Sequence, residues 1–530
     1  MIIVGIYGAY DWDALAPNGE TFMHDAGCTI FIDGKHICSI TEERLSRHKH
    51  DGNYPHRSID YCLSVAGITK NDVDVVYSVA SHHFIGLDQI DDGTAERMIQ
   101  RSFPKATIKF VGHHLAHSAS TVFTSPFNEG SFLTLDGGGS ALNNPCLMKV
   151  DFIENNSIGY FNKEKRIFRF YNMPEDGYNC FGNYYSGMSA AIMAAKTGKE
   201  YTNWLHLLGA IGKVMGLSAY GKLRDDKDGY AIVDHAMPYA TFGNYESESP
   251  EDAARYLQHT FENAMVDFLK ALRKYQLDEN VCFAGGCFLN ILANTAVKEA
   301  GIFDNIHIPP FVDDSGIAFG AAIWACFEYG EDILVPNDLA FLGKEYSDDE
   351  ILSALNMFGL SYSKYNPETI AQKIEDNKII GWFQGRSEAG PRALGSRSIL
   401  MSPKRAENKD IINERVKHRE MWRPFAGIIR EEDVAEYFEE GFVTPHMLYS
   451  QTSKTDKIPA ITHVDGTCRI QTVKSGRIYD LLGKLDVPVV LNTSFNDNGE
   501  PIVESPYHTI KAFLKMDMDT LVIGNYIVDK

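Results

Sequence analysis

The chain has 530 residues, 44% of them hydrophobic and 23% charged, a composition typical of a globular protein with about two to four domains. Its net charge of −21, from 50 basic against 71 acidic side chains, argues against a protein that holds long nucleic acid through phosphate contacts. The nine cysteines contain no CxxC pair, which argues against a cysteine-type zinc site and favours a reducing, cytoplasmic setting. No signal peptide or membrane segment is expected from the apolar runs.

The N-terminal part contains a pattern of strands that occurs twice. Apolar and alternating runs predict strands at 27–32 and 36–41, joined by Asp33 and Gly34, a strong two-residue turn signal. A long polar loop precedes this hairpin. After Ser131 a strand again ends in a polar, glycine-rich loop and is followed by two further strands. We interpret this as one supersecondary unit used twice, an arrangement that leaves a cleft between its halves.

A helix is predicted to start at His113, directly after a short buried strand. His113 and His117 are four residues apart, so both rings would project from one face, a spacing typical of metal ligands. Asp136 ends the next strand, beside a turn that begins with Gly137 and Gly138. A mixed nitrogen and oxygen set suits Fe(II), Mn(II) or Zn(II) rather than calcium. The alternative is a pair of solvated or core histidines.

The segment from about 181 to 275 has a mostly helical pattern. A strand then leads to Gly285 and Gly286, with a helix predicted to begin at Phe288. Paired glycines allow close backbone approach to a ligand, and a helix N-terminus favours phosphate. Asp314 follows another strand and precedes a small-residue helix. It is either a further carboxylate of the site or a helix N-cap.

The last part of the chain alternates strands and helices and is rich in basic residues next to apolar strands. These side chains could converge on one anion: Arg386, Arg392, Arg397, Lys417, Arg419, Arg423 and Arg469. Asn492 and Ser494 lie at a predicted strand end, where short polar groups could fix an amide or a base. These features favour a nucleotide or acyl-phosphate site, whereas a salt-bridged surface is the ordinary alternative.

Ordered sequence blocks over nearly the whole chain resemble one enzyme family. The blocks include EERLSRHKHDGNYP, HHLAHSAS, LDGGGS, GKVMGLSAYGK, FAGGCFLN, DDSGIAFGAA, GRSEAGPRALGSRSIL, KHREMWRPFA and LNTSFNDNGEPI. They resemble the O-carbamoyltransferases that decorate nodulation factors, cephamycins and tobramycin. The resemblance implies an α/β protein of two domains. Residues 1–345 would form a duplicated domain of the actin-like ATPase superfamily, with the helical segment as an insertion, and residues 346–530 a domain similar to the YrdC fold.

The resemblance also implies a two-step reaction. The C-terminal domain would join carbamoyl phosphate to ATP, with Mg²⁺ as an optional companion of ATP, and would give carbamoyl-adenylate and pyrophosphate. The N-terminal domain would then move the carbamoyl group to a hydroxyl of a small polar metabolite or natural product in a step assisted by Fe(II) or another divalent metal. Related enzymes suggest a homodimer, and neither nucleic acid nor a membrane is an expected partner.

Site residues are carried over from the matching motifs. His24 is a candidate general base, and Lys49 lies in the matching block after the first hairpin, although the loop before His24 is longer than in the family. The metal ligands would be His113, His117, Asp136 and Asp314. The residues expected to bind the co-substrates are Gly137, Gly138, Gly285, Gly286, Asn290, Arg392, Lys417, Arg423, Arg469, Asn492 and Ser494.

Other functional classes fit the sequence less well. An actin-like sugar kinase or ATPase is the main alternative, but it would need a carboxylate base and no His-x-x-x-His pair. A tRNA-modifying subunit is disfavoured by the charge of −21. A binding module without enzymatic activity would not need separate polar clusters on two domains.

Overall fold

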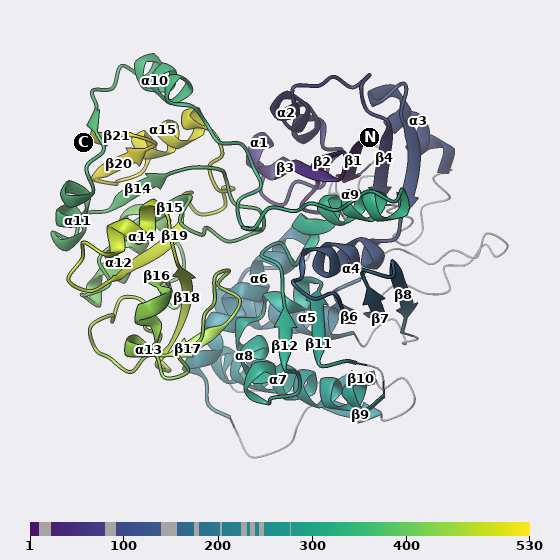
Figure 1. Ribbon diagram of the computed structural model, residues 1–530. Coiled ribbons are helices and arrows are strands. Elements are labelled where there is room, and N and C mark those ends of the chain that lie inside the picture. Colours follow the sequence, from purple (N-terminus) through teal and green to yellow (C-terminus); the bar gives the residue numbers. More distant parts are fainter. Residues whose placement is uncertain are drawn as a thin grey trace. The chain divides into compact units, whose positions relative to one another are not determined.

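The computed structural model describes residues 1–9, 23–79, 92–138, 156–173, 180–201, 204–223, 230–233, 239–242, 249–275 and 277–530. The chain forms two compact units (Figure 1). Unit 1 consists of residues 1–46 and 50–339, and unit 2 of residues 47–49 and 340–530. No helix among the described residues is both long and apolar enough to span a membrane. The two units are described separately below.

The first half of unit 1 is a five-stranded mixed sheet. Its strands are β1 (Ile2–Tyr7), β2 (Gly27–Ile32), β3 (Lys35–Thr41), β4 (Val75–Val79) and β5 (Thr107–Val111), in the order β3-β2-β1-β4-β5. The predicted hairpin is confirmed: β2 and β3 pair antiparallel across the two-residue turn, and β2 also pairs antiparallel with β1. The neighbours β1, β4 and β5 are parallel.

The second half of unit 1 repeats this topology. Its strands are β6 (Glu129–Leu135), β7 (Asn156–Asn162), β8 (Ile167–Asn172), β11 (Asn280–Ala284) and β12 (Asn305–His307), in the order β12-β11-β6-β7-β8. Again the first three strands are antiparallel and the later two join in parallel. The expected duplication is therefore confirmed. Membership of the actin-like ATPase superfamily stays a prediction.

Helices connect and cover these sheets. In the first half they are α1 (Glu42–Ser46), α2 (His56–Ala66) and α3 (Asp92–Ser102), followed by α4 (His113–Thr124), which starts where predicted. The equivalent of α4 in the second half is α9 (Ile317–Glu328). Helices α4 and α9 pack against each other, so the two repeats meet along them.

The predicted helical insertion lies between β8 and β11. It contains α5 (Phe181–Thr197), α6 (Trp204–Leu217) and α7 (Pro250–Tyr275), with a small hairpin of β9 (Tyr230–Val233) and β10 (Tyr239–Phe242). The apolar sides of these helices pack together, and α5 and α7 bury Phe181 and Phe261 between them.

The helix predicted to begin at Phe288 begins later. A 3-10 turn spans Gly286–Leu289, and α8 covers Ile291–Glu299. The side chain of Asn290 accepts the backbone N–H of Ala293 and so caps α8. The cap fixes the helix start at Ile291, because an Asn side chain supplies the acceptor that the first free backbone donors need.

Unit 2 contains a nine-stranded mixed sheet in the order β13-β21-β20-β14-β15-β19-β16-β18-β17. The strands are β13 (Ser363–Lys364), β14 (Ile380–Phe383), β15 (Arg397–Met401), β16 (Ala426–Arg430), β17 (Ser450–Thr452), β18 (Thr467–Val473), β19 (Val489–Ser494), β20 (Thr520–Ile523) and β21 (Tyr526–Asp529). The helices are α10 (Asp348–Met357), α11 (Pro367–Glu375), α12 (Glu407–Ile412), α13 (Val434–Tyr437), α14 (Arg477–Leu482) and α15 (Pro506–Lys515). Apolar cores cover both faces of the sheet.

The predicted class, an α/β protein, is confirmed in both units. Likeness of unit 2 to the YrdC fold stays a prediction. Most of the long loop that precedes His24 lies outside the described residues, and so does the first of the two strands predicted to follow the glycine-rich loop after Asp136.

Candidate functional site

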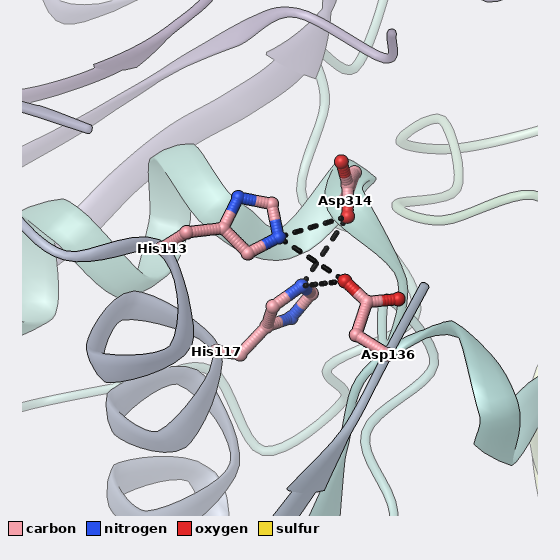
Figure 2. Close-up of side chains that lie close together, drawn as sticks. All are labelled: His113, His117, Asp136 and Asp314. Atoms are coloured by element: carbon pink, nitrogen blue, oxygen red, sulfur yellow. Dashed lines mark hydrogen bonds and ion pairs between the residues drawn. The ribbon is translucent and has the colours of Figure 1, made fainter. Parts of the chain in front are cut away.

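Four side chains from separate parts of unit 1 meet at one point (Figure 2). His113 and His117 lie on α4, which follows β5. Asp136 follows the end of β6, and Asp314 begins the 3-10 turn between β12 and α9. All four are buried. The duplicated topology explains why they meet. The loops and helices that follow parallel strands begin at the same edge of a sheet, which is where such folds bind ligands.

The distances within this quartet suit a bound metal ion. His113 Nε2 lies 3.1 Å from Asp136 Oδ2 and 3.5 Å from Asp314 Oδ1. His117 Nε2 lies 3.4 Å and 3.3 Å from the same two oxygens. For tetrahedral ligands about 2.05 Å from a metal, neighbouring ligand atoms are about 3.3 Å apart. The residues predicted from the sequence as metal ligands therefore form a compact N₂O₂ set that could hold one ion.

The charges of these four side chains also favour a bound metal ion. Burial alone would lower the pKa of His113, but the charges of Asp314 and Asp136 outweigh it and raise the pKa to about 10. Burial would raise the pKa of Asp136, whereas its bonds to His113 and His117 hold it well below the usual range. Two buried carboxylates need two positive charges. Protonated histidines supply them in the chain by itself, and a divalent cation held by neutral imidazoles would supply the same charge.

Neighbouring groups orient the two carboxylates. The backbone N–H of Gly286 donates to Asp136 Oδ1 at 3.1 Å, and the hydroxyl of Tyr7 donates to Asp314 Oδ2 at 2.8 Å. Gly285 has a φ of 96°, and a Cβ there would lie 2.1 Å from the carbonyl oxygen of Leu135. The glycine pair thus brings the loop after β11 against the end of β6, where it supports Asp136.

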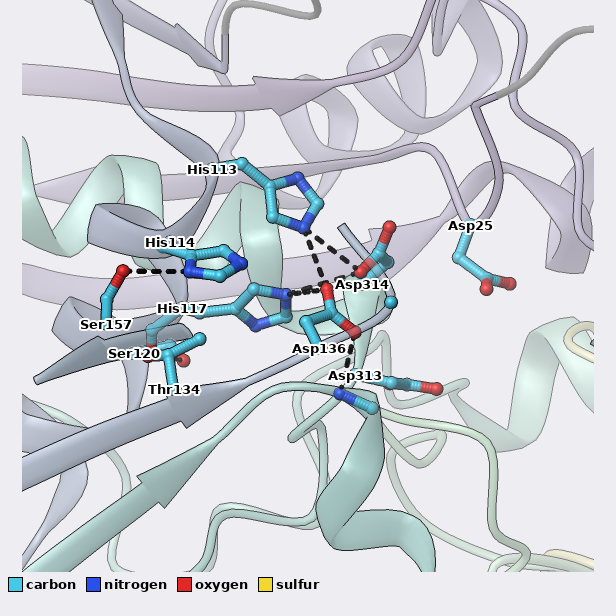
Figure 3. A network of polar contacts seen from close by, with 12 residues as sticks. Asp25, His113, His114, His117, Ser120, Thr134, Asp136, Ser157, Asp313 and Asp314 are labelled. Atoms are coloured by element: carbon cyan, nitrogen blue, oxygen red, sulfur yellow. Dashed lines mark hydrogen bonds and ion pairs between the residues drawn. The ribbon is translucent and has the colours of Figure 1, made fainter. Parts of the chain in front are cut away.

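A second polar chain lies beside the quartet (Figure 3). His114 Nδ1 is 2.9 Å from the Ser157 hydroxyl, which donates to Asn172 Oδ1 at 2.7 Å. The hydroxyls of Ser118 and Thr134 are 2.9 Å apart and tie α4 to β6. These contacts fix the helix that carries both histidines of the quartet.

His24 lies at the edge of the quartet. Its Nε2 is 3.4 Å from Asp314 Oδ2 and its Nδ1 is 2.9 Å from Asp25 Oδ2. Burial alone would lower the pKa of His24, but the charges of Asp314 and Asp25 raise it to about 9. The structure thus places the predicted general base beside the predicted metal ligands.

Unit 2 gathers basic side chains around one end of β18. Burial lowers the pKa of Arg469 well below its usual range, and the neighbouring positive charges lower it further. These charges are Arg392, Arg419 and Arg423. Arginine stays protonated in proteins, so cations held this close favour binding of an anion such as a phosphate. Burial lowers the pKa of Arg423 too, and the carboxylate of Glu420, 3.6 Å from the Arg423 guanidinium, acts against that shift.

The register of the sheet places two of these residues in one row. Ala426 of β16 pairs with Arg469 of β18 on one side and with Asn492 of β19 on the other. Residues opposite each other in neighbouring strands point to the same face. Asn492 also donates to the carbonyl of Ala393 at 2.8 Å, next to Arg392 in the chain. The short side chain of Ala426 lies between the longer ones of Arg469 and Asn492.

Lys417 is held by the strand end predicted to bind ligand. Its buried ammonium donates to the carbonyls of Ser494 and Asn496 at 2.8 and 2.6 Å and to Asn496 Oδ1 at 2.8 Å. Burial lowers the pKa of Lys417 well below its usual range, and the charges of Arg419 and Lys49 lower it further. Lys49 belongs to unit 2, in the same short segment as Arg47.

Several predicted residues have other contacts. Asn290 caps α8 and pairs with the buried Gln258 amide in both directions, at 3.0 and 3.1 Å. Arg386 donates to the carbonyls of Gly343 and Leu342, and buried Arg397 donates to the carbonyl oxygens of Gln384, Gly385, Ser396 and Glu504. Gly137 and Gly138 follow Asp136 directly. The role of Tyr7 and the support from the Gly286 N–H were not anticipated, since no sequence spacing signals contacts between such distant segments.

Comparison with known proteins gives consistent results along the chain. Residues 19–101 and 92–323 match a family model described as carbamoyltransferase N-terminus, and residues 371–530 one described as carbamoyltransferase C-terminus. Nodulation protein NolNO of Sinorhizobium fredii is 31% identical over 96% of this chain and 80% of its own length. Nodulation protein NolO of Bradyrhizobium diazoefficiens is 32% identical over 79% of each chain. An uncharacterized protein of Synechocystis is 29% identical over 96% of each.

Proposed function

Because the chain belongs to the carbamoyltransferase family and is a transferase enzyme, we propose that it is an ATP-dependent O-carbamoyltransferase with two reaction centres. Unit 2 activates the carbamoyl group as carbamoyl-adenylate, and unit 1 transfers it to a hydroxyl of a small polar metabolite. The observation that carries this proposal is the pair of unlike clusters, one a buried N₂O₂ set and the other a crowded set of cations.

The cation cluster of unit 2 suits the activation step. Carbamoyl phosphate and ATP together bring many negative phosphate oxygens, which arginine forks bind in pairs, while the Lys417 ammonium, held by Ser494 and Asn496, adds positive charge nearby. Carbamoyl phosphate loses phosphate to water, and the resulting carbamate oxygen attacks the α-phosphorus of ATP. Pyrophosphate leaves with the electron pair of the broken P–O bond. Arg392, Arg423 and Arg469 stabilise the charge that builds up on these oxygens.

The quartet of unit 1 suits the transfer step. His24 accepts the proton of the acceptor hydroxyl as its oxygen attacks the carbamoyl carbon, and AMP leaves. His113, His117, Asp136 and Asp314 would hold Fe(II) or another divalent metal. When bound, such an ion polarises the carbamoyl oxygen and neutralises the carboxylate charge that raises the pKa of His24.

Keeping both steps in one protein protects the activated group. A carbamoyl-adenylate reacts readily with water, so burial of the quartet limits its hydrolysis. The cytoplasm is the compartment that supplies ATP and carbamoyl phosphate, and it agrees with the reduced cysteines expected from the sequence.

The proposal is tested by pyrophosphate release. Purified protein given ATP and carbamoyl phosphate should release pyrophosphate, and omission of either substrate should prevent it. The Arg423→Met variant should release at least about 100-fold less, because it loses one fork of the anion site. Its metal content should not change.

A matched control lies in the same unit. Arg415 forms a surface ion pair with Asp517 at 2.7 Å, so Arg415→Met removes a guanidinium outside the cation cluster. It should keep normal pyrophosphate release. Absence of release from the unaltered protein would refute the activation step. An equal loss in both variants would contradict the proposed anion site.

A further inference from the structure

Asp25 bridges two imidazole rings beside the quartet. Its Oδ2 lies 2.9 Å from His24 Nδ1, and its Oδ1 and Oδ2 lie 3.1 and 3.3 Å from His50 Nδ1. Figure 3 shows Asp25 close to Asp314 and Asp313 at the edge of the polar network. The side chain is mostly buried, with 12% exposed.

The backbone around Asp25 is firmly held. The N–H of Ala26 donates to the carbonyl of Asp51 at 2.8 Å, and its carbonyl accepts the N–H of Glu42 at 2.6 Å. Asp25 itself has a φ of 57°, in the left-handed region that Asp tolerates better than most residues. The carboxylate therefore projects from a fixed point of the chain.

The hydrogen bond to Asp25 determines which nitrogen of His24 faces the quartet. A neutral imidazole has one N–H donor and one acceptor nitrogen. With Nδ1 bound to the Asp25 carboxylate, Nε2 is the nitrogen on the side of Asp314, at 3.4 Å from its Oδ2. A neutral ring held in this way presents an acceptor to a hydroxyl placed at the quartet, whereas an unrestrained neutral ring could turn either nitrogen toward it.

We propose that Asp25 is a positioning residue for carbamoyl transfer: its carboxylate holds the His24 ring with Nε2 directed at the quartet, where the acceptor hydroxyl gives up its proton. The inference rests on the proposed function, in which His24 is the base. His50 has no role in positioning His24, and its backbone N–H is held separately by Glu43 Oε2 at 2.9 Å.

Two substitutions separate positioning from local folding. Asp25→Gly removes the acceptor without strain, because glycine accepts a φ of 57°. Asp25→Asn keeps a neutral oxygen at the same place. The control is His50→Asn, which removes the other imidazole on Asp25 and suits the positive φ of 54° at that position.

The assay uses ¹³C-labelled carbamoyl phosphate, ATP and the small-molecule extract of cells that make the protein. Label incorporation is followed by mass spectrometry over a dilution series of the extract. Asp25→Gly should lower the maximal rate by about 10- to 100-fold, with the half-saturating extract concentration unchanged. Asp25→Asn should recover part of the rate. Pyrophosphate release and metal content should stay normal in both.

His50→Asn should transfer at close to the normal rate. An unchanged maximal rate in Asp25→Gly would overturn the inference, as would an equal loss in His50→Asn, since that pattern indicates a folding role. Both results leave the proposed function standing. Absence of label incorporation by the unaltered protein would instead refute the proposed function and this inference together.

Discussion

Replacing Glu388 should loosen the loop 389–397, which carries the anion-site arginine. Glu388 is buried, and its Oε1 accepts three backbone N–H groups at 2.9 Å each. The donors are Leu394, Ser396 and Arg397. One carboxylate oxygen thus organises a loop that would otherwise have three buried donors without a charged acceptor. Glu388→Ala removes all three bonds.

The magnitude follows from these bonds. A buried donor left without a partner costs about 1–3 kcal/mol, so three would cost up to about 9 kcal/mol in a rigid loop. Because the loop can relax and admit water, we expect a loss of about 3 kcal/mol in the free energy of local opening. Amide exchange in peptides from 389–397 should accelerate by about 100-fold.

Hydrogen–deuterium exchange measures this directly. The matched control is Glu436→Ala on α13, which removes an exposed carboxylate from the same unit. In Glu388→Ala the concentrations of ATP and carbamoyl phosphate for half-maximal pyrophosphate release should also rise, because the loop positions Arg392. Unchanged exchange in 389–397 would refute the reasoning, even if the activity fell.

Three further outcomes are expected. Gly285→Ala should lower the free energy of unfolding by more than about 2 kcal/mol in thermal denaturation, because the new Cβ would meet the carbonyl of Leu135; normal stability would contradict the close approach. Asn290→Ala should cost about 1–2 kcal/mol through loss of the α8 cap, and a neutral effect would count against it. Metal uptake should release protons, since His113 has a pKa raised to about 10; calorimetry in two buffers should show this, and His117→Ala should abolish the uptake.

Local signals explain how much of the fold was predictable. Asp33 and Gly34 specify a two-residue turn, and the structure places β2 and β3 on either side of it. The four-residue spacing of His113 and His117 puts both rings on one face of a helix, as observed in α4. The duplicated strand pattern likewise followed from apolar runs and the loops after them. Each of these features is encoded within a few neighbouring residues.

Contacts between distant segments were beyond such signals. The Tyr7 hydroxyl reaches Asp314 across 307 positions of the chain, and the Gly286 N–H reaches Asp136 across 150. No periodic sequence pattern signals either contact, because both depend on how the two repeats of unit 1 pack against each other. Asn290 shows the opposite problem: the family resemblance implied a co-substrate contact, while its observed contacts are a helix cap and an amide pair. A cap and a ligand-binding residue use the same side-chain chemistry.

The measurement that tests the central claim most directly separates the two steps in one variant. The double variant His113→Ala and His117→Ala removes both imidazoles of the quartet and none of the cation cluster in unit 2. Given ATP, ¹³C-labelled carbamoyl phosphate and cell extract, it should keep releasing pyrophosphate and should incorporate no label into any metabolite. Loss of pyrophosphate release together with transfer, or normal label incorporation without the two histidines, would contradict an account with two separate reaction centres.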